Sequence, residues 1–141
     1  MKIYKGIIKK VPSEEHFKEY SEGNLDMSDL RLEDTIIRAK SDKGEFDILP
    51  IRLSYREVDK DGNEKYIYDE GADAYIKTYS QTPVLYAHGK EMRILCELGE
   101  YSPVKLVVTE EYKDDRTFLN IECVQNQHSG LEPQLEMNLE D

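Results

Sequence analysis

The sequence is poor in the residues that most often carry chemistry. Its 141 residues include no tryptophan, two cysteines and three histidines. The histidines lie far apart, and no spacing of cysteine and histidine matches a metal site, so we expect no metal and no cofactor. Both cysteines, Cys96 and Cys123, fall in the apolar phase of predicted strands, which predicts two reduced thiols in the core.

Signatures of catalysis are also missing. The chain has no G-x-S-x-G sequence, no phosphate-binding loop and no dinucleotide-binding glycine pattern. Glu57, Asp59, Asp61 and Gly62 match the first half of a calcium-binding EF-hand loop. However, Tyr68 stands where that loop needs its last glutamate, so we predict a hairpin turn instead. The sequence therefore predicts a protein that is not an enzyme.

Long apolar runs are absent as well. None approaches the roughly 20 residues of a membrane span, and the N-terminus lacks the apolar core of a signal peptide. We therefore expect a cytoplasmic protein with no membrane partner. The net charge of −11 disfavours unassisted binding to duplex DNA. This charge is uneven, because residues 1–20 carry +2 whereas residues 101–141 carry −6.

The residues that are present form strand patterns. Residues 86–127 predict a meander of three strands. Its segments 92–98 and 117–124 alternate apolar and polar residues, and its middle segment 104–109 is β-branched and nearly all apolar. Turn-forming residues separate these strands, as at 113–116.

The first half of the chain adds further strands, at residues 2–11, 35–39 and 45–58. The last is broken at Pro50, where a bulge or an edge position is expected because proline cannot donate to the ladder. If Val58 and Glu64 flank the next turn, Arg56 lies opposite Tyr66 and Ser54 opposite Tyr68.

Two segments have helical features. Ser13 predicts the N-cap of a short helix that Gly23 ends, with Phe17 and Tyr20 facing the sheet. Residues 69–81 fit either a helix or a strand.

The fold class expected is therefore mostly β with one or two short helices, as a small curled antiparallel sheet or an OB-like barrel. One β-rich domain would span residues 1–127, followed by an acidic tail over 128–141.

One face of the predicted sheet carries arginine beside tyrosine. Its members are Arg52, Arg56, Tyr66 and Tyr68. Guanidinium groups neutralise phosphates and tyrosine rings stack on unpaired bases, so this face is a candidate site for single-stranded DNA. The alternative is ordinary sheet-surface chemistry, since both residue types suit solvent-facing strand positions.

These patterns resemble a known family. A sheet hairpin, an intervening helix, a glycine-led strand (GKEMRILCEL) and a hairpin with a charged tip (LVVTEEYKDDRTFLNIECVQ) are similar to the later half of bacterial single-stranded-DNA-binding proteins of the OB-fold type. The similarity covers residues 45–127. It implies a non-catalytic module of nucleic-acid maintenance, of the kind found in phages and mobile elements.

The acidic tail contains a second resemblance. Gln134, Leu135, Met137 and Leu139 resemble the peptide by which bacterial replication proteins bind the sliding clamp, in which a few apolar side chains fill a preformed groove. This resemblance implies a tail that recruits replication partners. The alternative is a disordered acidic tail or an amphipathic terminal turn.

A different function also fits the composition. A small, strongly acidic domain without catalytic residues is typical of phage inhibitors that mimic DNA, such as anti-CRISPR or anti-restriction proteins. Such a protein would bind the basic groove of a host nuclease, with carboxylates such as Glu110, Glu111, Asp114 and Asp115 imitating phosphates. Acidity for solubility alone is the simpler explanation.

Overall fold

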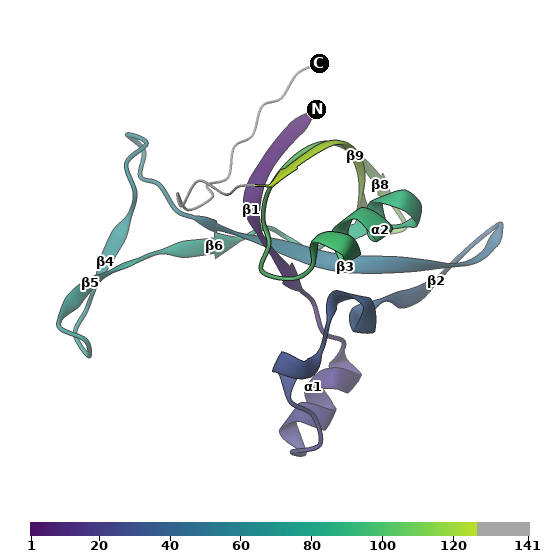
Figure 1. Ribbon diagram of the computed structural model, residues 1–141, viewed down its shortest axis with the longest axis horizontal. Coiled ribbons are helices and arrows are strands. Elements are labelled where there is room, and N and C mark those ends of the chain that lie inside the picture. The colour runs from purple at the N-terminus through teal and green to yellow at the C-terminus, as the bar shows by residue number, and fades with distance from the viewer. Residues whose placement is uncertain (127–141) are drawn as a thin grey trace.

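The computed structural model describes residues 1–126. Within this part of the chain, most residues lie in strands (Figure 1). In chain order the elements are β1 (Lys2–Lys10), α1 (Glu14–Ser21), η1 (Met27–Asp29), η2 (Leu32–Thr35), β2 (Ile37–Ser41), β3 (Gly44–Arg56), β4 (Tyr66–Asp69), β5 (Ala74–Lys77), β6 (Tyr79–Gln81), β7 (Leu85–Ala87), α2 (Gly89–Leu98), β8 (Pro103–Lys113) and β9 (Arg116–Asn126).

Five of these strands close into a barrel. The order around it is β1, β8, β9, β7 and β3, and pairing between β1 and β3 completes the circle. All neighbours are antiparallel except β7 and β9, which run parallel. In chain order the barrel strands are β1, β3, β7, β8 and β9, and α2 lies between β7 and β8. This closed barrel is compatible with an OB-like fold (Figure 1). The predicted mostly β fold class is confirmed.

Barrel closure depends on a close approach of β1 to β3. Gly6 lies where β1 passes from β8 to β3, and a Cβ atom on this residue would lie 2.9 Å from the Cβ atom of Leu53. Any other residue there would force the two strands apart. The interior is filled by buried apolar side chains from all five strands and from α2, including Tyr4, Ile8, Leu49, Ile51, Leu53, Leu85, Leu95, Val104, Leu106, Val108, Leu119 and Ile121.

The predicted strand at 92–98 is wrong, because these residues form helix α2. Leu95 is buried, and Met92 and Cys96 pack beside it on the core, which is the spacing of one helix face. Burial raises the pKa of the Cys96 thiol. Gly99 ends the helix with a φ of 84°. The meander is therefore reduced to the β8–β9 hairpin, whose predicted turn at 113–116 is confirmed.

A β-bulge corrects the prediction for the second cysteine. Val107 pairs with Cys123 whereas Val108 pairs with Ile121, so Glu122 is an extra residue in β9. The extra residue reverses the inward and outward alternation beyond Ile121. Cys123 is consequently exposed rather than in the core.

Other predictions have mixed outcomes. The helix after Ser13 is confirmed as α1, but Phe17 and Tyr20 are more than half exposed instead of facing the sheet. Residues 69–81 contain strands and not a helix. Pro50 pairs with Tyr86 of β7. It lies between the last residue of β3 that pairs with β2, Ile48, and the first residue of β3 that pairs with β1, Ile51.

The predicted pairing of Arg56 with Tyr66 is also wrong. A bridge between Val58 and Glu64 does close the turn. Beyond it, β4 pairs with β5 in a separate two-stranded sheet, and Arg56 pairs with Tyr79 of β6. Figure 1 shows the β4–β5 hairpin standing away from the barrel.

No helix in residues 1–126 is long and apolar enough to cross a membrane.

Candidate nucleic-acid interface

Four aromatic rings gather on the outside of the barrel, at Phe46, Tyr86, His88 and Phe118. The ring of Phe118 is central, with centroid distances of 5.5 Å to His88, 5.9 Å to Tyr86 and 6.5 Å to Phe46. Phe46 and His88 also meet edge to face, at 5.8 Å. Residues from β3, β7 and β9, together with the N-cap residue of α2, thus build one aromatic cluster.

The strand registers explain why these rings converge. Tyr86 of β7 lies directly beside Phe118 of β9 in the parallel pair, and residues that pair directly share a face. His88 follows two residues after Tyr86, on the same side of the chain. Phe46 lies near the start of β3, where β2 widens the sheet by pairing Ala39 with Phe46.

A small core of its own supports this cluster from below. Ala39, Ile48 and Phe118 are buried, and Ile37, Phe46 and Tyr86 pack against them. This core lies on the opposite side of the barrel wall from the main core, because the residues of β3 alternate between the two. The rings are therefore held in place by packing and not only by contact with one another.

A hollow of about 460 Å³ opens over the rings. Phe46, His88 and Phe118 line its apolar part, while the turn between β2 and β3 and the end of β8 supply its polar rim. His88 is exposed, whereas Phe118 is 7% exposed. The hollow therefore offers a fixed apolar floor, the exposed ring of His88 and the half-buried ring of Phe46.

Charges of both signs surround the hollow. Lys43 and Lys113 lie on its rim beside Glu45 and Glu111. Glu45 accepts a hydrogen bond from Arg38 at 3.4 Å, so part of its charge is already compensated. The guanidinium of Arg116 lies over the Tyr86 ring, 5.4 Å from its centroid. In a chain with a net charge of −11, this local balance leaves cations available beside aromatic rings.

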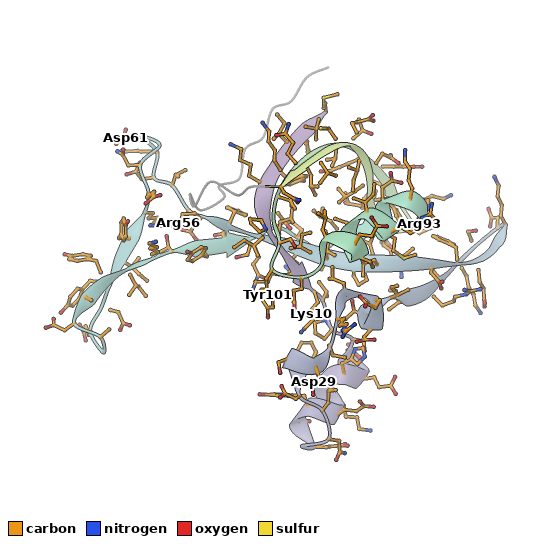
Figure 2. The ribbon with its side chains drawn as sticks, viewed as in Figure 1. Lys10, Asp29, Arg56, Asp61, Arg93 and Tyr101 are labelled. Carbon is orange, nitrogen blue, oxygen red and sulfur yellow. The ribbon has the colours of Figure 1, made fainter. Side chains whose placement is uncertain are left out.

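Arg56, one of the predicted site residues, is fully buried. Its Nη1 donates to the backbone carbonyls of Lys65 at 2.6 Å and Thr78 at 3.0 Å. Its guanidinium lies 4.7 Å from the ring centroid of Tyr66 and 5.8 Å from that of Tyr79. Figure 2 shows Arg56 where β3 meets the base of the hairpin. These contacts hold the hairpin in place, and no solvent-facing surface remains for a phosphate.

The other three predicted residues are divided between two places. Arg52 is half-buried on the outer face of β3, and its Nη1 donates to the carbonyl of Thr82 at 3.1 Å. Tyr66 and Tyr68 lie on β4 and are each about half exposed. The hydrogen bond from the Tyr68 hydroxyl to Asp73 raises the pKa of that tyrosine. The structure therefore does not combine these residues into one open face.

Two further expectations concern the tail and metals. The predicted clamp-binding residues Gln134, Leu135, Met137 and Leu139 lie outside the described residues. Among residues 1–126, no group of three or more histidine, cysteine or acidic side chains is placed to hold a metal ion.

Comparison with protein-family models, curated proteins and solved structures finds no match to this chain. The site is therefore defined by its own geometry. Sequence reasoning missed Phe46, His88 and Phe118 because they are far apart in the chain and none belongs to a motif. The available signal was that the three chain segments each place an aromatic ring within five residues of a lysine, at Lys43, Lys90 and Lys113.

Proposed function

We propose that this chain binds single-stranded DNA through the aromatic hollow and does not catalyse a reaction. The observation that carries the proposal is the aromatic cluster of Phe46, Tyr86, His88 and Phe118, held on the outer wall of an OB-like barrel. Unpaired bases stack on such rings, and nearby cations neutralise the backbone.

The position of the cluster supports the same proposal. In OB-like barrels, oligonucleotides bind on the second and third barrel strands and on the loops beside them. In this chain the second and third barrel strands, counted along the sequence, are β3 and β7, which supply Phe46 and Tyr86. The hollow is bordered by two turns. The β2–β3 turn belongs to the connection between the first two barrel strands, β1 and β3, and the β8–β9 turn joins the last two. A single strand crossing this face would meet the rings and, next to them, Lys43 and Lys113, which also line an adjoining hollow.

The test is a fluorescence anisotropy titration of a labelled single-stranded oligonucleotide, at low and moderate salt, beside duplex of the same sequence. We expect binding to the single strand that weakens as salt rises. Phe46→Ala removes one half-buried stacking surface and should lower affinity by roughly 5- to 150-fold, the equivalent of about 1–3 kcal/mol.

The control is Phe17→Ala, which removes an exposed ring from α1, away from the barrel face. It should leave affinity unchanged. Absence of binding at low salt would overturn the proposal. So would an equal loss of affinity in both variants, because the hollow would then have no special role.

The C-terminal peptide with Gln134, Leu135, Met137 and Leu139 stays a prediction of this proposal, as a ligand for a sliding clamp. A synthetic peptide of residues 128–141 titrated against a bacterial clamp tests it directly. Replacement of Gln134 and Leu135 by alanine should abolish the interaction, because these residues would set register and fill the groove.

One observation favours a second function, an acidic inhibitor that imitates DNA. Between residues 13 and 35 the chain carries eight carboxylates and two cations, and all eight carboxylate residues are exposed. This segment includes α1 and projects from the barrel (Figure 1). Such a projection could enter the basic groove of a host nuclease. Competition with duplex DNA for a nuclease, in the absence of oligonucleotide binding, would favour this function over the first.

A further inference from the structure

A second hollow, of about 450 Å³, adjoins the aromatic hollow. We call it the lysine hollow. The β2–β3 and β8–β9 hairpins supply its lining residues, which are Lys40, Ser41, Asp42, Lys43, Lys113 and Asp114. The two hollows share Ser41, Lys43 and Lys113. A ligand in the aromatic hollow therefore lies next to the lysine hollow.

The two hollows differ in chemistry. The aromatic hollow contains the rings of Phe46, His88 and Phe118, whereas no described residue that lines the lysine hollow is apolar or aromatic. An unpaired base needs a ring on which to stack, so the lysine hollow does not suit a base. A phosphate group needs cations that donate hydrogen bonds. The pair of hollows therefore suits a base on one side and a phosphate on the other.

The three lysines of the lysine hollow are available to an anion. Lys40, Lys43 and Lys113 are exposed, and within residues 1–126 none of their ammonium groups makes an ion pair. The Ser41 hydroxyl is engaged inside the β2–β3 turn, where it donates to the Gly44 carbonyl at 3.3 Å and accepts from the Lys43 amide at 3.2 Å. The ammonium groups are thus the side-chain donors that remain for a ligand.

The charge of the lysine hollow also favours an anion. Its three lysines outnumber its two aspartates, although the whole chain has a net charge of −11. A terminal phosphate carries about −1.5 to −2 at pH 7, whereas a phosphate inside a strand carries about −1. The more highly charged group gains more from these cations.

The lysine hollow lies where two hairpins end. Ser41 pairs with Gly44 across the β2–β3 turn, and Lys113 pairs with Arg116 across the β8–β9 turn. Figure 1 shows the β2–β3 turn at the end of the molecule opposite the β4–β5 hairpin. A strand that leaves the aromatic hollow here reaches the edge of the sheet and a hollow without a ring. This place suits the end of a strand better than its continuation.

We propose that the lysine hollow binds the terminal phosphate of a single strand whose end base stacks in the aromatic hollow. The proposal rests on the proposed function, because it names the part of the strand that the same site holds. The ammonium groups of Lys40, Lys43 and Lys113 donate hydrogen bonds to the phosphate oxygens. Either end of a strand can carry such a phosphate, so the experiment compares both ends.

Competition among oligonucleotides tests the proposal. A labelled single strand is displaced by three unlabelled competitors of one sequence, with a 5′ phosphate, a 3′ phosphate or two hydroxyl ends. We expect a phosphorylated end to bind roughly fivefold more tightly than the hydroxyl ends. Equal binding of all three competitors would overturn this inference and leave the proposed function standing. Failure of the labelled strand to bind at low salt would overturn both.

Three variants separate the phosphate from the base. Lys40→Gln changes a residue that lines the lysine hollow but not the aromatic one and should reduce the preference for a phosphorylated end to about twofold or less. Phe46→Ala should weaken all competitors equally and keep the preference. Lys18→Gln makes the same charge change on an exposed residue of α1 and should alter neither. An equal loss of preference in Lys18→Gln and Lys40→Gln would overturn the proposal.

A variant that gains preference excludes misfolding as the explanation. Asp114→Asn removes a carboxylate from the lysine hollow, and asparagine tolerates the φ of 54° at this position. The preference for a phosphorylated end should rise by roughly two- to fivefold. Asp115→Asn makes the same change one residue further on, outside the hollow lining, and should leave the preference unchanged. No rise in Asp114→Asn, or an equal rise in both variants, would overturn the proposal.

Discussion

The hairpin base and the aromatic hollow both place an arginine beside aromatic rings, but the two arginines differ in burial. At the hairpin base, the Arg56 guanidinium has aromatic rings beside it and backbone carbonyls as acceptors, and no part of it reaches solvent. At the hollow, Arg116 is only half-buried over Tyr86, and an open volume of about 460 Å³ lies nearby. Arginine beside tyrosine is thus fully buried within the fold in one place and remains partly exposed in the other. Burial, and not residue type, distinguishes the two.

The largest effect that would test this contrast is on stability. Arg56→Ala removes a buried donor to two backbone carbonyls and the cation beside two rings. We expect the free energy of unfolding to fall by about 3 kcal/mol, measured by chemical denaturation. Arg52→Ala, with one hydrogen bond to Thr82, should cost about 1 kcal/mol or less. Equal costs for the two variants would contradict a special structural role for Arg56.

A smaller effect is expected from the aromatic partner of Arg56. Tyr66→Ala removes the ring that lies 4.7 Å from the guanidinium and should lower stability by about 1 kcal/mol. Its effect on oligonucleotide affinity should stay below about fivefold, the low end of a stacking contribution. A loss as large as that of Phe46→Ala would instead show that bound DNA reaches the hairpin, as the sequence predicted.

The smallest effect is a pH dependence at the hairpin base. The Ser80 hydroxyl that donates to Glu57, together with Lys65, holds the pKa of that carboxyl below its ordinary value of 4.5. Because the folded pKa is lowered, the stabilisation is present above pH 4.5 and is lost as pH falls through the folded pKa. Glu57→Gln should remove this part of the acid dependence, as measured by denaturation between pH 7 and pH 3. An unchanged acid profile would contradict the assignment.

The elements that sequence reasoning located correctly depend on local signals. The helix after Ser13 follows from its cap, since the Ser13 hydroxyl accepts from the His16 amide and the first turn is acidic. The turn between β8 and β9 follows from aspartates, because Asp114 and Asp115 both adopt positive φ. Each of these signals involves only residues that are neighbours in the chain.

The errors share a different cause. Residues 92–98 satisfy a strand period and a helix period at once, and only the barrel opening that α2 covers selects the helix. The exposure of Cys123 depends on a bulge in its pairing with β8. The role of Arg56 depends on carbonyls nine and twenty-two residues away in the chain. None of these contacts has a local signature.

The sequence by itself determined the β-rich composition of the domain, the long strand that became β3 and the turns of the hairpins, because alternation and turn chemistry act over a few residues. Only the tertiary structure decided that the sheet closes into a barrel and that Phe46, His88 and Phe118 meet on its outer wall. It also decided that Arg56 is buried, whereas the sequence predicted an exposed binding residue. These outcomes depend on pairings between distant strands, whose registers determine which side chains face one another.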